Sequence, residues 1–368
     1  MIESVYIFSL LVLSVTLFAM GLLYLFLNVS ENPKLEAYRK AAKAMAFTYM
    51  FFGMVNNLEI LERFSIETSD NSLLFRMVTL IIASAQAFSF TFAMVSLVNT
   101  KYMTPKRSWR EVFAVLAFLV AGLLSYLVLD KRFTSIFAYF YTAYYFSQLI
   151  RYTLIFRKLY RQCLLEMENY FSGYEEGRLR WISYSFYSAL GIGLIALIFS
   201  LLPFALFGLL CSLSCLIFYV FFAIRFVNYA FIFNILEDVV SEEPETESAD
   251  SLPISLEKKS VAAFKRGINQ WVADKQYCQA GVTIKDLADY LGTNTKYLSL
   301  YINNYEGKTF RNWIGALRVE EARSLMQNDL SCKLDTIAEH VGYSNKSAFL
   351  LQFSKQMNMT PSEWKGCL

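Results

Sequence analysis

The feature that most constrains the fold is a series of long apolar segments that fills about the first two thirds of the chain and stops near residue 236. A helix needs about 20 mostly apolar residues to cross a hydrocarbon core of about 30 Å. The sequence contains seven such runs, at roughly 4–27, 44–61, 73–99, 111–129, 133–156, 182–202 and 207–233. The pattern predicts an all-α protein whose residues 1–236 form a bundle of seven transmembrane helices.

The composition divides the chain at the same place. Hydrophobic residues make up 56% of the chain and charged residues 18%, whereas soluble domains have about 45–50% and about 25%. Residues 237–250 hold seven acidic residues and no basic one, and such a stretch cannot bury enough apolar surface to fold. We therefore expect an acidic flexible linker at 237–255 and a soluble domain at 256–368.

The basic residues of the connections predict how the seven spans are oriented. Lys and Arg are enriched in cytoplasmic connections. The first, third and fifth connections hold four, four and five of them, the second and fourth hold one and two, and the last holds none. This alternation places the N-terminus outside and the C-terminus in the cytoplasm, which an odd number of spans requires. We expect a multi-pass protein of the cytoplasmic membrane.

Polar residues in or near the apolar runs are the candidates for a signal site, because the outer connections are short. Glu59, Glu62 and Arg76 lie near the outer ends of the second and third spans, Gln86 lies deeper, and Gln148 lies toward an inner end. Such residues mark ligand paths or pack between helices. The first three either form a rim site or face the lipid headgroups. The expected signal is a small or lipophilic molecule.

After residue 255 the apolar spacing becomes that of amphipathic soluble helices. Thr283 and Asp286 match a capping box at a helix start, and Gly292 stands where a left-handed helix end is needed. A second short helix is expected from Thr295, followed by a long helix over 310–327.

The same pattern returns about fifty residues later. Residues 334–341 correspond to 284–291, and Gly342 corresponds to Gly292. A helix over 347–355 then carries apolar residues on one face, and Thr360-Pro361 begins another helix. Two short helices joined by a glycine turn present the second one to a major groove about 12 Å wide. The repeat predicts two helix-turn-helix units on either side of one long helix.

Together these segments resemble the AraC-type DNA-binding domain. The segments that carry the resemblance are Asp286-Leu287-Ala288, Leu298-Ser299, Gly307-Lys308-Thr309-Phe310, Leu317-Arg318-Val319-Glu320-Glu321-Ala322, Ile337-Ala338-Glu339-His340-Val341-Gly342-Tyr343, Phe349-Leu350-Leu351-Gln352-Phe353 and Met359-Thr360-Pro361-Ser362-Glu363-Trp364. The resemblance covers residues 256–368 and implies a seven-helix domain with two helix-turn-helix units that regulates transcription.

Matching positions to the family pattern gives the residues expected to contact DNA. Members of the family often carry Arg where this chain has Leu300 and Leu351. Arg reads guanine, whereas Leu contacts only apolar groups such as the thymine methyl. For each single side chain the alternative is a solvated helix face. The reduced set indicates weak binding by one copy, and therefore action as a homodimer or on paired sites. The expected contacts are Lys296, Ser299, Leu300, Asn303, Asn345, Lys346, Ser347, Leu351, Gln352 and Lys355.

The two halves together predict a one-component regulator that senses a signal in or at the bilayer and controls binding to double-stranded promoter DNA and, through it, RNA polymerase. The alternative is a membrane transporter or channel with a C-terminal regulatory or protein-docking domain. The six cysteines and the single histidine show no metal-ligand spacing, and no catalytic set is recognised. We therefore expect neither an enzyme nor a cofactor.

Overall fold

A computed structural model describes residues 2–29, 31, 35–64, 72–128, 131–173, 177, 179–201, 205–241 and 258–368. Within these ranges the regular secondary structure is helical, and the remaining feature is an isolated bridge between Phe171 and Thr283. The chain forms two compact units, Met1–Cys163 with Arg178–Val240 and Leu164–Gly177 with Ser241–Leu368. The prediction of an all-α fold is confirmed for the described residues.

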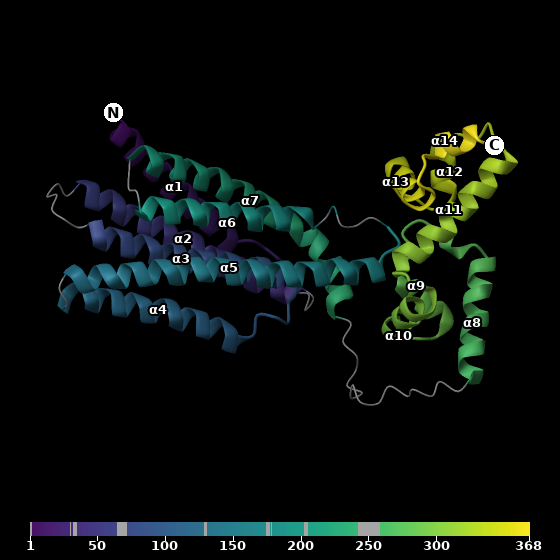
Figure 1. Cartoon of the computed structure of the whole chain (residues 1–368), viewed down its shortest axis with the longest axis horizontal. Helices are drawn as coiled ribbons and strands as arrows, with labels where there is room; N and C mark the ends of the chain where they lie inside the picture. Colours follow the sequence, from purple (N-terminus) through teal and green to yellow (C-terminus); the bar gives the residue numbers. More distant parts are fainter. Residues whose placement is uncertain are drawn as a thin grey trace. The chain divides into compact units, whose positions relative to one another are not determined.

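Seven long helices build the first unit, and each corresponds to one of the predicted apolar runs. They lie beside one another along the length of the unit (Figure 1). Their bounds are α1 Ile2–Leu25, α2 Glu36–Phe64, α3 Ser72–Val98, α4 Pro105–Val128, α5 Lys131–Tyr170, α6 Arg180–Leu201 and α7 Ala205–Ser241. Helix α5 extends well beyond this unit, because its residues from Leu164 onward belong to the second one.

Five of these helices are long and apolar enough to cross a membrane, among the residues described: Ile2–Leu25, Thr79–Val98, Pro105–Val128, Arg180–Ile198 and Leu206–Tyr229. The other two, α2 and α5, contain the predicted second and fifth spans but carry more polar residues. Lys40 and Lys43 lie in the first turns of α2, and Arg157 and Lys158 follow Arg151 in α5. Composition and length therefore support several apolar spans, and the count of seven stays a prediction.

The third helix is the most enclosed of the five. Of its apolar window 61% is buried, against 11% for α4. Ser84 of α3 donates a hydrogen bond to Gln148 of α5 over 2.6 Å, and Phe90 of α3 packs at 5.1 Å, between ring centres, on Phe218 of α7. The middle of the bundle is thus formed around α3.

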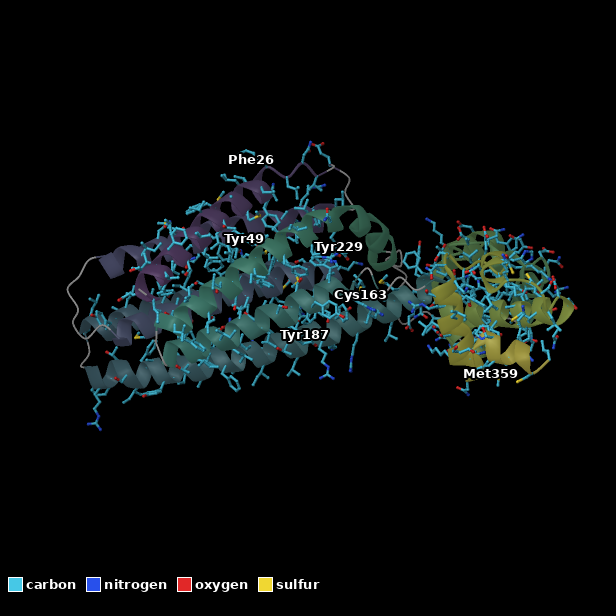
Figure 2. The ribbon with its side chains drawn as sticks, turned by 90° about the horizontal axis from the view of Figure 1, so that it is seen from above. Phe26, Tyr49, Cys163, Tyr187, Tyr229 and Met359 are labelled. Atoms are coloured by element: carbon cyan, nitrogen blue, oxygen red, sulfur yellow. The ribbon has the colours of Figure 1, made fainter. Side chains whose placement is uncertain are left out.

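Tyrosines line the interior of the bundle and donate across it. Tyr38 and Tyr49 of α2 donate to the carbonyls of Phe226 and Tyr219 of α7 over 2.7 and 3.0 Å. Tyr49 and Tyr229 lie between the helices (Figure 2). The outer surface is apolar instead, with Phe8, Phe113 and Leu127 exposed by 65%, 72% and 76%. Its large hydrophobic residues are spread over all of the apolar helices, and soluble monomers rarely expose so much continuous apolar surface.

The second unit contains the seven α-helices that the family resemblance implied. A 3-10 turn at Gln276–Cys278 and a π-turn at Ile302–Glu306 interrupt them. Helix α7 continues to Ser241, past the start expected for the linker, and residues 242–257 lie outside the described part of the chain. The bounds are α8 Lys258–Ala273, α9 Ile284–Leu291, α10 Thr295–Tyr301, α11 Phe310–Asn328, α12 Leu334–His340, α13 Lys346–Met357 and α14 Pro361–Gly366.

Two apolar cores lie side by side along α11. The first contains Trp271, Leu287, Leu298 and Ile314, and Tyr170 from the end of α5 packs against it. The second contains residues from α11 to α14, among them Val319, Ala322, Ile337, Phe349 and Phe353. Each core supports one predicted helix-turn-helix unit, and α11 supplies residues to both.

Candidate nucleic-acid interface and bundle cavity

The first helix-turn-helix unit consists of α9 and α10 and has the capping predicted for it. The Thr283 hydroxyl accepts from the amide of Asp286, and the Asp286 carboxylate accepts from the amide of Thr283 over 2.7 Å. Gly292 ends α9 with φ of 63°, a conformation in which an L side chain is strained. Asn294 then caps α10 by accepting from the amide of Tyr297. The turn between the two helices is fixed by these local bonds.

The second helix-turn-helix unit, α12 and α13, repeats the glycine turn and the capped second helix of the first. Gly342 takes φ of 86° in the turn, and Asn345 caps α13 by accepting from the amide of Ala348 over 2.8 Å. Asn358 ends α13 with φ of 55°, and Thr360 and Glu363 form a full capping box on α14. The predicted helix start at Thr360-Pro361 is confirmed.

Arg318 of α11 links the segment before the first helix-turn-helix unit to the second helix-turn-helix unit. The residue is 2% exposed, and its guanidinium donates to the carbonyls of Tyr277 and Gln279 over 2.7 and 2.8 Å. It also lies 5.3 Å from the ring centre of Tyr343, which follows the turn of the second unit. Burial lowers the pKa of Arg318, and the neighbouring Tyr343 and Cys278 act in the opposite direction. The residue nevertheless stays charged at neutral pH, because the ordinary pKa of Arg lies far above neutral pH.

On α10, the second helix of the first unit and its reading helix, the structure exposes two of the four predicted contacts. Lys296 and Leu300 are exposed, and Ser299 and Asn303 are half-buried. The amide of Asn303 lies 3.4 Å from the hydroxyl of Ser299, one turn away. All four residues line one exposed stretch of α10 and the π-turn after it, so they remain together as a candidate contact surface.

On the second reading helix, Lys346, Ser347, Leu351 and Lys355 are exposed. Leu351 is 56% exposed, so its apolar side chain is accessible at the surface. Lys346 donates to Asp335 of α12 over 2.9 Å, and both side chains are largely solvated. The ammonium group of Lys346 is therefore exposed but already paired with the Asp335 carboxylate.

Two predicted contacts have other roles in the fold. Gln352 is 2% exposed and packs against Gly315 of α11 so closely that a β-carbon at Gly315 would overlap it. The prediction that Gln352 flanks the reading face was wrong, since α13 turns this side chain toward α11. The side-chain oxygen of Asn345 is used by the helix cap, and its side-chain amide donates to the Ser344 hydroxyl over 3.4 Å.

Sequence reasoning assigned no role to Arg318, although a signal was present. It lies four residues after Ile314 and four before Ala322, so it occupies a position on the buried face of α11. A basic residue at such a position indicates a buried hydrogen-bonding role, because an unpaired buried charge costs several kcal/mol.

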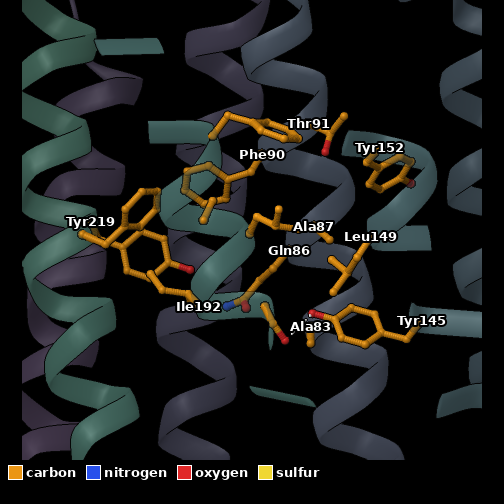
Figure 3. A pocket seen from close by; sticks show the side chains of 15 residues that line it. Ala83, Gln86, Ala87, Phe90, Thr91, Tyr145, Leu149, Tyr152, Ile192 and Tyr219 are labelled. Atoms are coloured by element: carbon orange, nitrogen blue, oxygen red, sulfur yellow. Dashed lines mark hydrogen bonds between the residues drawn. The ribbon is translucent and has the colours of Figure 1, made fainter. Parts of the chain in front are cut away.

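A cavity of about 50 Å³ lies among α3, α5, α6 and α7, which is several times the roughly 10–15 Å³ that one water needs. Most of its lining is apolar, including Phe90 and Leu149 (Figure 3). The polar groups on its wall include Gln86, Tyr145 and Tyr152. Gln86, proposed from the sequence as a ligand residue, thus lies on the wall of a cavity.

Gln148 lies beside this cavity within a chain of hydrogen bonds. It accepts from Ser84 and donates to the Tyr152 hydroxyl over 3.0 Å. Tyr152 in turn donates to Glu111 over 2.8 Å, and Arg151 forms a bidentate pair with Glu111 at 2.8 and 2.6 Å. This series of hydrogen bonds connects the cavity wall to a charged pair between α4 and α5. The side chains of Glu59, Glu62 and Arg76 lie outside the described part of the structure.

The comparisons with known proteins concern helix-turn-helix proteins. A family profile described as a helix-turn-helix domain matches residues 287–366. The Bacillus subtilis (strain 168) protein called "Uncharacterized HTH-type transcriptional regulator YobQ" is 34% identical over 88 residues, which are 24% of this chain and 36% of that protein. The chain thus matches about a third of that relative's length. No solved structure matches the chain.

The paired units, their caps and these matches define the class of the C-terminal domain. It is an AraC-type helix-turn-helix domain, and domains of this kind present the second helix of each unit to the DNA major groove.

Proposed function

We propose that this chain is a membrane-embedded one-component transcription regulator. The observation that carries the proposal is the pair of capped helix-turn-helix units built on one helix, α11, with Lys296, Leu300, Lys346 and Leu351 exposed on their second helices. The relative in Bacillus subtilis carries the name of an HTH-type transcriptional regulator. Double-stranded promoter DNA is the proposed partner, and RNA polymerase the proposed target of regulation.

A location in the cytoplasmic membrane is supported by the first unit. Its helices include five of spanning length, and their outward side chains are apolar while tyrosines fill the interior. Water would penalise that surface, whereas lipid would not. The basic connections favour a cytoplasmic C-terminus, where the helix-turn-helix domain meets DNA. The seven-span topology belongs to this proposal.

The cavity among α3, α5, α6 and α7 is the proposed signal site. Its apolar wall with few polar groups suits a small lipophilic molecule that carries one hydrogen-bonding group. Such a molecule acts by binding one arrangement of the bundle more tightly than another. Gln86 and Tyr152 are the residues proposed to orient it, and the hydrogen-bond chain through Gln148 would respond to its presence.

DNA binding by residues 253–368 tests the central claim. The purified fragment is incubated with sheared genomic DNA at 50 mM salt, and bound fragments are sequenced. We expect enrichment of defined promoter segments. The log of the affinity should fall linearly with the log of the salt concentration, with a slope of about −0.9 for each phosphate neutralised.

A fragment that carries both Lys296→Ala and Lys346→Ala serves as the control, because both side chains are exposed and their removal leaves the two cores intact. It should bind the same segments more weakly and with a shallower salt slope. Uniform recovery of genomic DNA by the unmodified fragment, with no segment preferred at low salt, would refute the proposal.

A further inference from the structure

The C-terminal end of α5 belongs to the same compact unit as the DNA-binding helices. This helix runs without interruption over Lys131–Tyr170. Its residues up to Cys163 fall in the first unit, and Leu164–Gly177 fall in the second together with Ser241–Leu368. We refer to residues 164–173 as the α5 tail. The tail is separated in sequence by more than a hundred residues from the helices against which it packs.

Backbone hydrogen bonds hold the last residues of the tail. The amide of Ser172 donates to the carbonyl of Val282 over 3.2 Å, and the Ser172 hydroxyl donates to the same carbonyl. Phe171 and Thr283 form an antiparallel bridge. Ser172 and Val282 are both 5% exposed. These bonds fix the tail to the residues that immediately precede and cap α9.

Side chains extend the contact along the last turn of α5. Glu168 lies 3.5 Å from the guanidinium of Arg311, whose side chain is 4% exposed, while that of Glu168 is 27% exposed. Tyr170 packs against the first apolar core of the domain. A buried guanidinium with a carboxylate beside it is sensitive to loss of that carboxylate, because the remaining charge cannot reach water. The contact therefore combines backbone pairing, a charge pair and apolar packing.

The hydrogen bonds, the bridge and the charge pair of the tail lie outside the reading helices, α10 and α13. On the domain side they involve Val282 and Thr283 before α9, and Arg311 at the start of α11. Lys296 and Leu300 of α10 remain exposed. The contact thus leaves the first reading helix accessible. It holds the residues just before the first helix-turn-helix unit, and it also holds α11, the helix that carries both helix-turn-helix units.

We propose that the α5 tail is a docking element that attaches the DNA-binding domain to the helix bundle independently of the covalent connection after α7. A shift of α5 would then reach the first helix-turn-helix unit through Glu168, Tyr170 and Ser172. The signalling role rests on the proposed function, whereas the attachment does not depend on DNA binding or on a membrane.

Cutting the covalent connection tests the attachment. The full chain receives an N-terminal affinity tag and a site for a specific protease within residues 242–257, is purified in detergent and bound to a resin. After cleavage, the fraction of the C-terminal fragment that stays on the resin is measured at low and at 500 mM salt. We expect most of it to be retained, because the backbone pairing and the Tyr170 packing survive at high salt.

Variants of the tail provide the decisive comparison. Glu168→Lys combined with Tyr170→Ala should raise the released fraction at least about tenfold, which corresponds to a loss of about 1.4 kcal/mol. Both substitutions lie in the bundle fragment, so the released fragment keeps its native sequence, and circular dichroism of the released fragment verifies that it stays folded. Gln162→Lys, at an exposed position of the same helix, is the matched control and should retain the fragment.

Two results would overturn the proposal. One is complete release of the fragment from the unmodified chain after cleavage. The other is equal retention by the unmodified chain and the double variant, which would place the attachment elsewhere. Neither result bears on promoter binding by the isolated domain, so failure of the docking contact is distinguishable from failure of the proposed function. Native elution volume of the double variant before cleavage verifies that its bundle is intact.

Discussion

At the scale of single residues, the turn of the second helix-turn-helix unit is determined by a contact as well as by its backbone. Gly342 has φ of 86°, and a β-carbon there would overlap the carbonyl of Cys278 and lie 3.1 Å from the guanidinium of Arg318. Gly292, at the equivalent turn of the first unit, has φ of 63° and open space around it. A substitution at Gly292 therefore tests conformational strain alone, whereas a substitution at Gly342 tests strain and close packing together.

We expect Gly292→Ala to destabilise the domain by about 1–2 kcal/mol, which is the usual strain of an L residue in the left-handed region. Gly342→Ala should cost at least about 1–3 kcal/mol more, because the extra methyl also displaces the Cys278 carbonyl. Urea unfolding of residues 253–368 followed by circular dichroism measures both. Equal losses for the two variants would mean that the second turn relaxes freely.

The capping box on α14 predicts a pH dependence. The Glu363 carboxylate accepts from the amide of Thr360 over 2.7 Å, and that bond lowers the pKa of Glu363. A lowered folded-state pKa gives stability that is present above the unfolded value and is lost as pH falls through the folded one. Glu363→Gln should therefore lower the melting temperature at pH 7 and have almost no effect near pH 3. A constant difference across this range would contradict the assignment.

Local signals were predictable at this scale, and packing was not. Thr283 and Gly292 were predicted correctly because caps depend on neighbours within a few residues in sequence. Gln352 was misplaced because polar residues usually face solvent, and only the proximity of Gly315 on another helix makes room for it. The role of Arg318 depends on carbonyls about forty residues away in sequence.

At the scale of elements, the two reading helices differ in their charge environment. Both helices offer a Leu, Leu300 in α10 and Leu351 in α13, where the family often has Arg. In α13, in addition, Lys346 is paired with Asp335. Pairing with a carboxylate reduces the attraction of Lys346 for phosphate, although an exposed pair of this kind contributes little to folding. The pair therefore acts on binding more than on stability.

Asp335→Asn should strengthen DNA binding about two- to fivefold at low salt, because it releases Lys346 from an exposed pair worth about 0.2–1 kcal/mol. The melting temperature should change little. Fluorescence anisotropy with an enriched promoter segment measures the affinity. Glu320→Asn, which removes an exposed carboxylate paired within α11, controls for net charge. An equal gain in the two variants would show a general charge effect without a role for Lys346.

Helix positions along the chain were largely predictable, because each long apolar run became one helix. Two features were not. Helix α5 continues to Tyr170, well beyond the run at 133–156, since its last turns are stabilised by partners in the second unit and not by lipid. The π-turn after α10 also lacks a signature in the apolar spacing.

At the scale of the whole molecule, the cavity and the α5 tail together give one helix two tasks. Leu149 and Tyr152 of α5 line the cavity, and Glu168 and Tyr170 lie about four to five turns further along the same helix. The sequence revealed Gln86 and Gln148 as unusual polar groups in apolar runs. It did not reveal the union of residues 164–177 with 241–368, because contacts over such a separation leave no local pattern.

Filling the cavity should fix the regulator in one state. Ala87 lies on the cavity wall, so Ala87→Leu would occupy part of the space proposed for the signal. Transcript profiles of strains with the unmodified chain, the variant and a deletion identify the regulated promoters and test their response. We expect the variant to respond to no growth condition that alters these transcripts in the unmodified strain. Ala85→Leu, one position outside the lining, is the control, and a normal response by Ala87→Leu would exclude the cavity as signal site.

The construction of α11 has a consequence for the DNA itself. One helix carries both cores, and Arg318 contacts both the segment before α9 and Tyr343 after the turn of the second helix-turn-helix unit. The two reading helices therefore keep a fixed separation and rotation. A target site must then present its two contacted segments at a fixed angular phase around the duplex. Inserting about five base pairs, half of the 10–10.5 in one helical turn, moves the second segment to the opposite side of the DNA. Inserting a full turn restores the phase and still leaves the second segment beyond the reach of one domain.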